Sequence, residues 1–526
     1  MKSRLLLLVL LSFVTALLLA FSFNEATQTS SAPPQKSKTI IRCGPDWEQL
    51  EKYFDETDIP PIEGSGNHTW KISTTSDSAQ FYFNQGINMY YSFHIIEGMA
   101  SFKKAEKFDP ASAMIQWAQA LAYGPNINDM GYAASPQALA VSHRAHELMA
   151  SGTEREKLLI NAMQVRYSSD STASREKLNQ LYVDRMKDAY TKYPNDADIA
   201  ALYADALMLQ HPWDLWNING TPKPWTPTIR TVLEKLLARY PNHPGANHYY
   251  IHVMEASPYA IKALASADRL GKITPALSHT VHMPSHIYLR TGHYNKGITV
   301  NENAVNSYKK VLPLYAPVAG NDFLYVIHNL HMQVNSALMA GRMAYAIETS
   351  LETIKNTPTD YLAAPGGLAS YMQAIYMLPV ITDVRFARWQ QLLDHPQPPA
   401  SQVYANVFYR FGRGMALSQM SKPDEARNEL EAIRELIKDP VLQLPFPPFS
   451  PAIEGAKVAE KMLEGNIALM EKKYTVAINA FSQANKIEEN MIYTEPRDWL
   501  LNPKHYLGKA YLLAGQFANA EKTFRK

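Results

Sequence analysis

The sequence predicts an all-α protein, an α-solenoid in which helix-turn-helix repeats stack into a right-handed superhelix. Three observations lead to this prediction. Apolar residues recur at helical spacing from about residue 78, strand-like alternation is nowhere sustained, and small and large residues return at fixed places in a 34-residue unit. The chain has 526 residues, 46% of them apolar, which is enough to bury a large core. We therefore expect one continuous solenoid over residues 76–526.

The first 23 residues have the pattern of an export signal. Lys2 and Arg4 precede an uncharged, mostly apolar run from Leu5 to Phe23, and the chain turns polar at Asn24. The run is also long enough to remain as an N-terminal membrane anchor. In either case we expect an exported protein, periplasmic or extracellular, whose only link to a membrane is this segment. Residues 24–75, with clusters of Ser, Thr, Pro and Gly, are expected to form a linker or an irregular cap.

Both ends of the predicted solenoid carry the pattern of a tetratricopeptide repeat (TPR). In this unit a Gly or Ala at positions 8 and 20 lets the two helices approach closely, and large residues at positions 11 and 24 fill the space between them. The matching residues are Gly86, Gly98, Phe102, Ala105 and Pro110 near the start, Gly465, Ala477, Phe481 and Ala484 in the last full unit, and Leu507, Gly508, Tyr511, Gly515, Ala520 and Phe524 at the end. Weaker matches between them include Gly341, Ala346, Pro358, Gly414 and Ala426. The solenoid is therefore predicted to be TPR-like.

Three longer connections interrupt the repeat, from Gly124 to Asp129, from Pro212 to Pro227 and from Pro445 to Pro451. Asn residues in a turn such as the first usually hydrogen-bond their own backbone. The Trp residues of the second loop are typical of a buried plug. As an alternative, the first two loops could act as lids over the groove of the solenoid.

Charge and composition exclude several classes of function. Fifty-one Lys and Arg against 49 Asp and Glu leave a net charge of +2 at pH 7, so we expect no nucleic-acid partner. The single cysteine, Cys43, excludes a disulfide framework and a Cys-rich zinc site. The sequence has no Gly-rich phosphate loop, dinucleotide fingerprint, nucleophile elbow or Cys-x-x-Cys motif. The common types of nucleotide, hydride-transfer, esterase and thiol chemistry are therefore not the activities that we expect first.

The histidines are the strongest functional signal. Eight of the sixteen lie between His248 and His331. With the register fixed on Gly292 and Gly341, seven of them share positions 2, 5 and 9 of successive first helices: His248, His252, His279, His282, His286, His328 and His331. First helices line the concave wall of a TPR stack, so we expect these rings to face one groove.

The spacing within this set favours a transition-metal centre. Residues four apart lie above one another on a helix, so His248 and His252 are placed to hold one ion, and the same pair returns 34 residues later. Imidazoles with one carboxylate suit zinc, copper or iron better than calcium or magnesium, and the number of rings allows a dinuclear site. The predicted ligands are His248, His252, His282 and His286, with His279, His328, His331 and Glu255 as further ligands or neighbours.

Other interpretations of these histidines stay open. A groove lined by His and Tyr can bind a peptide, a partner protein or a small-molecule ligand without metal, and the rings can also serve packing alone. If metal is bound, the pattern does not decide between a metalloenzyme, oxidative or hydrolytic, and a protein that handles metal. Five other histidines are expected at the surface or in structural roles: His68, His143, His146, His395 and His505. His243 and His293 lie near turns and are expected at the surface. His94 is an additional candidate outside the register.

Four segments together resemble a widespread group of bacterial exported TPR proteins. They are the turn Gly124 to Asn128, the run His211 to Trp216, the stretch His243 to Ser257 and the segment His282 to Tyr294. The resemblance covers roughly residues 80–350. It implies the solenoid fold, but the group has no established activity and supplies no catalytic residue, so the histidine assignments depend on register alone.

Overall fold

In this computed structural model the described residues are 58–128, 132, 134–170, 172–315, 323–447 and 449–525, together with Trp47, Leu50 and Phe54. Over these residues the chain forms α-helices joined by turns, loops and short 3-10 segments, and no β-strand occurs; the predicted all-α class is confirmed. The helices of the first half are α3 (Asp77–Tyr91), α4 (Ile95–Phe108), α5 (Ala113–Ala122), α6 (Pro136–Leu148), α7 (Glu154–Gln164), α8 (Arg175–Lys192), α9 (Ala197–Leu209), α10 (Thr226–Arg239), α11 (Pro244–Glu255), α12 (Leu264–Ile273), α13 (Ser278–His282) and α14 (Pro284–Arg290). The second half contains α15 (Tyr294–Tyr315), α16 (Phe323–Ala340), α17 (Met343–Asn356), α18 (Leu368–Tyr376), α19 (Leu378–Arg385), α20 (Trp389–Asp394), α21 (Val403–Gln419), α22 (Pro423–Leu436), α23 (Ala452–Met470), α24 (Tyr474–Asn490), α25 (Pro503–Leu513) and α26 (Phe517–Phe524).

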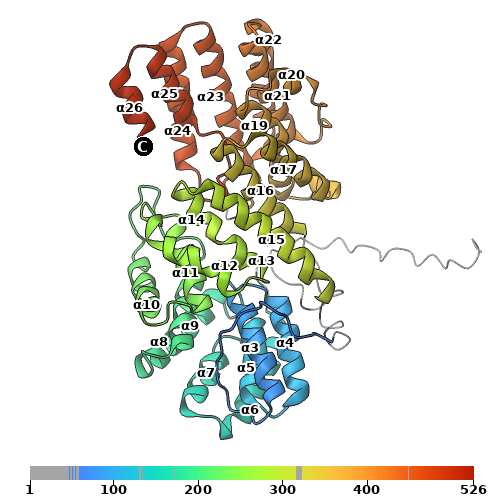
Figure 1. Ribbon diagram of the computed structural model, residues 1–526, viewed down its shortest axis with the longest axis vertical. Coiled ribbons are helices and arrows are strands. Elements are labelled where there is room, and N and C mark those ends of the chain that lie inside the picture. Colours follow the sequence, from blue (N-terminus) through green and yellow to red (C-terminus); the bar gives the residue numbers. More distant parts are fainter. Residues whose placement is uncertain are drawn as a thin grey trace, which may run out of the picture. The chain divides into compact units, whose positions relative to one another are not determined.

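Most helices pack chiefly against the next one along the chain (Figure 1). This holds near the start for α3 and α4, in the middle for α15 to α17, and at the end for α23 to α26. Nearest-neighbour packing of this kind defines a solenoid. The predicted α-solenoid is therefore confirmed.

The TPR register is visible where paired helices approach most closely. A methyl group added at Gly86, Gly465 or Gly508 would lie 2.4, 2.7 or 2.5 Å from a ring carbon of Phe102, Phe481 or Phe524, respectively. In each pair the phenylalanine follows the glycine by sixteen residues, the spacing of positions 8 and 24. The ring thus occupies the space that a side chain at position 8 would need.

A second recurring feature is the turn between paired helices, seven residues after position 8. Residues in this turn have a positive φ: Gly292, Gly341 and Gly515, and also Phe93, Ala387, Ser421 and Lys472. Glycine adopts this conformation without strain, whereas other residues are strained by about 1–2 kcal/mol. Phe93, with a φ of 55°, is the largest side chain of the set.

Two features of the histidine-bearing region differ from the prediction. The helix expected to carry residues 279 to 286 is broken at Met283, because Pro284 begins a new helix there. In addition, α11 packs against α3, which is distant in sequence, and this contact brings the α3–α4 turn onto the histidine-bearing helices. Consequently the rings are mostly buried and do not line an open groove as predicted.

The predicted localisation needs a correction. Over the part of the chain that the structure describes, we find no helix that combines the length and the apolar character needed to cross a bilayer. The prediction of a periplasmic or extracellular protein with an N-terminal anchor is therefore withdrawn. Residues 1–23, on which the signal prediction depends, lie outside the described residues, and the boundaries predicted at 23 and 75 stay predictions.

Candidate metal centre

Helix α11 carries the first part of the candidate centre, and every one of its residues is buried. Pro244 occupies its first turn, and His243 caps it by accepting a hydrogen bond from the backbone N–H of Ala246. His248 and His252 follow one turn apart on one face, as the helical period requires. Glu255 ends the helix on the side of His252.

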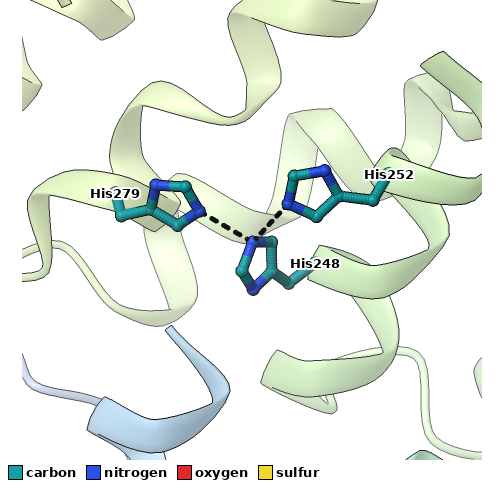
Figure 2. A group of neighbouring side chains, drawn as sticks. All are labelled: His248, His252 and His279. Carbon is teal, nitrogen blue, oxygen red and sulfur yellow. Dashed lines mark hydrogen bonds between the residues drawn. The ribbon is translucent and has the colours of Figure 1, made fainter. Parts of the chain in front are cut away.

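Three imidazoles form the first group, called here the first triad: His248, His252 and His279 (Figure 2). The Nε2 atom of His248 lies 3.0 Å from Nε2 of His279 and 3.1 Å from Nε2 of His252. His279 comes from α13 and the other two from α11, so the triad joins two consecutive repeats. All three rings are buried.

The second triad consists of His282, His286 and His328. Nε2 of His282 lies 3.1 Å from Nε2 of His286, and the ring of His328 on α16 lies 4.7 Å from that of His282 between centroids. His328 is half-buried and the other two are buried. The triads are adjacent, because the rings of His279 and His282 are 5.5 Å apart.

Hydrogen bonds to Nδ1 fix the tautomer of four of these rings. The Nδ1–H of His248 donates to the backbone oxygen of Tyr91 at 2.7 Å. The Nδ1–H of His282 donates to Asn301 Oδ1 at 3.2 Å, and Asn301 Nδ2 donates to a backbone oxygen, which sets the amide orientation. Each of these rings therefore turns an unprotonated Nε2 toward its triad.

Glu255 orients one ring of each triad. Its Oε1 accepts from Nδ1 of His252 at 3.1 Å, and its Oε2 accepts from Nδ1 of His286 at 2.5 Å. Burial alone would raise the pKa of this carboxyl, but the charges and hydrogen bonds of His252 and His286 hold the pKa at about 2. Glu255 is therefore ionised at neutral pH and acts on the centre from the outer side of the rings.

Electrostatics keep several of the imidazoles neutral. Burial, and then the neighbouring rings, lower the pKa of His248, His279 and His282 well below the usual value. Burial also lowers the pKa of His328 to about 3. These rings present lone pairs at neutral pH without first losing a proton.

The distances between the Nε2 atoms have a chemical consequence. Two unprotonated nitrogens about 3 Å apart repel each other unless a cation lies between their lone pairs. Nitrogens bound to one tetrahedral ion at about 2.0–2.1 Å are about 3.3 Å apart. The spacings of 3.0 and 3.1 Å are close to this value, and the ligand atoms of each triad lie within 4.8 Å of one another.

Aromatic side chains enclose the first triad. The ring of Phe93 lies 4.4, 5.8 and 5.4 Å between centroids from those of His248, His252 and His279, respectively. Trp213 meets His252 edge to face at 5.6 Å. Both Phe93 and Trp213 have a positive φ, a strain that often marks functional sites. The repeat pattern did not indicate a role for Phe93, because the turn position that Phe93 occupies usually favours glycine.

The remaining predicted residues lie around the triads. His331 is buried, but it belongs to neither triad, and its Nδ1 has no hydrogen-bond partner among the described residues. His94, the additional candidate, is buried and accepts a hydrogen bond from the backbone N–H of His279 at 3.3 Å. It therefore supports the first triad through the backbone.

A third group corrects the prediction that His243 lies at the surface. His68 and His243 both contact Asp198 Oδ1, at 2.7 and 3.4 Å, and His243 is buried. Because Nδ1 of His243 accepts from Ala246, its Nε2 must carry the proton and donate to Asp198. This ring has no free lone pair for a metal, so the group serves as a structural hydrogen-bond cluster. The signal that could have revealed it is the N-cap position of His243 before Pro244.

The other histidines agree with their expected minor roles. His143, His146 and His505 are exposed, and His395 Nε2 donates a hydrogen bond to Asp383 at 2.8 Å, away from the triads. His293 is half-buried beside Thr291.

No protein-family model matches this chain, and no curated protein matches it significantly. Solved structures with low similarity include the human IFIT1 dimer with m7Gppp-AAAA, at 12% identity over 91% of this chain and 92% of that chain with a TM-score of 0.31. Yeast Tom70 matches at 12% identity, over 84% and 90%, with a TM-score of 0.29. The Cut9–Hcn1 heterotetramer of the APC/C matches at 11%, over 84% and 78%, with a TM-score of 0.28. Similarity at this level supports no conclusion about the site.

Proposed function

We propose that this chain binds two transition-metal ions, one at each histidine triad. The observation that carries the proposal is the convergence of Nε2 atoms at 3.0 and 3.1 Å within the triads. Four of the rings, those of His248, His252, His282 and His286, are each held from behind by an acceptor at Nδ1. Such outer hydrogen bonds are the usual support of metal-bound histidines. A cluster that served packing alone would gain by pairing these nitrogens with donors.

Copper fits this set of ligands better than zinc or iron. Non-haem iron sites with imidazoles usually include a carboxylate ligand, and both oxygens of Glu255 already accept from imidazole Nδ1 atoms. Two divalent ions would bring four positive charges into a buried site to which Glu255 contributes one negative charge. Two copper(I) ions would bring only two positive charges. This is more favourable, because burying charge that no opposite charge balances costs free energy.

Three protein ligands leave room for another ligand on each ion. Catalytic zinc sites share this number, whereas structural zinc sites usually have four protein ligands. We therefore favour a centre that binds an exogenous ligand, in a metalloenzyme or a metal-handling protein, over a purely structural site.

Metal analysis of the loaded protein tests the proposal. After incubation with copper(I) or zinc and removal of excess metal, the wild-type chain should retain about two ions of its preferred metal. His248→Ala and His282→Ala should each retain about one, and the double variant none. His143→Ala, at an exposed histidine outside both triads, is the matched control and should retain two. Equal metal content in wild type and the double variant would contradict the proposal.

The alternative is a TPR module that binds a peptide or partner protein without metal. It stays a prediction, and the same variants test it. Partner binding that survives the double variant, in a wild-type chain that retains no metal, would favour this alternative over a metal centre.

A further inference from the structure

A small pocket is lined by two residues of the candidate centre, His252 of the first triad and Glu255. Its other walls come from Ile127 in the loop after α5, from Met208 near the end of α9, and from the loop between α9 and α10. That loop contributes His211, Trp213 and Leu215. Both connections that the sequence offered as lids therefore contribute to one pocket, the first through Ile127 and the second through Trp213 and Leu215.

The free space in this pocket is small. Its volume is about 10 Å³, which is the room that a single water molecule takes. The apolar lining comes from Ile127, Met208 and Leu215 with the indole of Trp213, and the polar lining residues are His211, His252 and Glu255. The pocket therefore has room for a small ligand next to His252.

Trp213 is the lining residue whose ring contacts that of His252. Its indole meets the ring of His252 edge to face, with centroids 5.6 Å apart. The side chain is only half-buried, so it lies between the centre and the surface. Its backbone has a φ of 61°, which few residues other than glycine adopt.

The surrounding loop is fixed on both sides of Trp213. The ring of His211 stacks on Trp225 with centroids 3.4 Å apart, and Trp225 Nε1 donates to the backbone oxygen of Asp214. Trp216 Nε1 donates to the backbone oxygen of Val253 on α11 at 2.7 Å. Since its neighbours are held in this way, Trp213 keeps its place next to His252, and its size sets the opening.

The opposite wall is also fixed. Arg166, which is fully buried, donates from Nη2 to the backbone oxygen of Pro125 at 3.1 Å, and Asn128 N–H donates to Asn126 Oδ1 at 2.8 Å as the sequence predicted for this turn. Ile127 lies between these bonds. A larger ligand would thus have to displace Trp213 rather than this loop.

We infer that this pocket admits the exogenous ligand of the first triad, and that Trp213 restricts that ligand to small molecules such as dioxygen, water or a small anion. The inference depends on the metal centre proposed above. It makes Trp213 a residue that determines size selectivity without itself contacting the metal.

Two probe ligands of different size test this inference on protein that is loaded with copper(I) and then oxidised to copper(II), the state that gives the absorption and resonance signals. Azide is thin enough for the pocket, whereas imidazole requires a wider opening. In Trp213→Ala, imidazole should bind at least about tenfold more tightly than in wild type, as expected when a steric clash is removed. Azide should bind both proteins within about threefold. Binding is followed by the change in copper absorption and in the electron paramagnetic resonance spectrum.

Controls separate this inference from the proposed function. Trp389→Ala removes a half-buried Trp on α20, away from the pocket, and should leave both affinities unchanged. Trp213→Phe keeps a smaller aromatic ring and replaces the alanine variant if that variant does not fold. Its affinity for imidazole should be higher than that of wild type and lower than that of Trp213→Ala. If wild type and both Trp213 variants retain two copper ions per chain and bind imidazole with equal affinity, the inference about Trp213 is overturned, whereas the proposed metal centre is not. A wild-type chain that retains no metal would overturn the metal centre and the inference with it.

Discussion

Glu255 sets the orientation of histidines in both triads. Each of its oxygens accepts from a different ring, His252 in the first triad and His286 in the second. Both Nδ1 atoms must carry protons for these bonds, so in each neutral ring the lone pair is on Nε2, which faces the triad. A single side chain thus prepares two ligand sets, although it belongs to neither.

Replacing this carboxylate should therefore weaken both metal sites. In Glu255→Gln only one amide atom is an acceptor, and the NH₂ group must face one of the two Nδ1–H groups. We expect metal affinity to fall about 10- to 100-fold, the usual effect of removing an outer hydrogen bond, measured by competition with a chelator. Glu234→Gln is the control, because Glu234 accepts from Tyr250 on the outer side of α11. Unchanged metal affinity at both sites would contradict the role of Glu255.

Asp205 should make stability depend on pH. Burial raises its pKa from 3.8 to about 6, although Arg166 and the hydrogen bond from Tyr90 oppose the shift. Between about pH 4 and pH 6 the folded state then binds more protons than the unfolded state, so stability falls as pH rises.

The variant Asp205→Asn tests this expectation, because it keeps an acceptor for Tyr90 and removes the ionisation of residue 205. Its free energy of unfolding should match wild type below pH 4 and exceed it by up to about 3 kcal/mol above pH 6. Urea denaturation across this range measures the difference, and a constant difference at all pH values would contradict the expectation.

At the scale of helices and turns, the repeats were predictable where a close contact demands one residue type. Gly86 and Phe102 are sixteen residues apart in the sequence and pack against each other in the structure, so the spacing of these two residue types predicts their contact. The paired histidines were predictable for the same reason, since four residues make one helical turn. The break at Met283 is a different case. Pro284 starts a helix there, and a proline can either start or end one, so the sequence pattern did not separate a continuous helix from two short ones.

Two glycines in helices should respond in opposite ways to alanine. Gly86→Ala places a methyl group 2.4 Å from the ring of Phe102, so we expect a loss of about 1–3 kcal/mol through overpacking. Gly271→Ala in α12 meets only ordinary contacts at 3.7 Å and should gain up to about 1 kcal/mol from helix propensity. Thermal denaturation compares the two variants with wild type. Equal stability of both would contradict the assigned register.

At the scale of the whole chain, the centre draws on segments that no local pattern connects. Tyr91, whose backbone oxygen orients His248, precedes it by 157 residues, and Asn301 follows His282 by 19 residues on another helix. Phe93 stands where the repeat favours glycine. The sequence predicted the ligands by their period, but it could not predict the contact of α3 with α11 that buries them. The difference between an open groove and an enclosed centre depends on that contact.

This long-range contact leads to a prediction for the metal-loaded protein. Because the α3–α4 turn contributes the acceptor for His248 and the ring of Phe93, metal binding should slow local opening of residues 91–94 as well as of α11. At a free metal concentration a hundred times the Kd, amide exchange that requires this opening should slow by up to about 100-fold. Exchange in α22, which packs against α21 and α23, should stay unchanged. Hydrogen exchange followed by mass spectrometry compares loaded wild type with the His248→Ala, His282→Ala double variant, which should show no change on adding metal. Protection restricted to α11–α14 would mean that the N-terminal repeat docks independently of the centre, and the turn would then be a cover rather than part of the site.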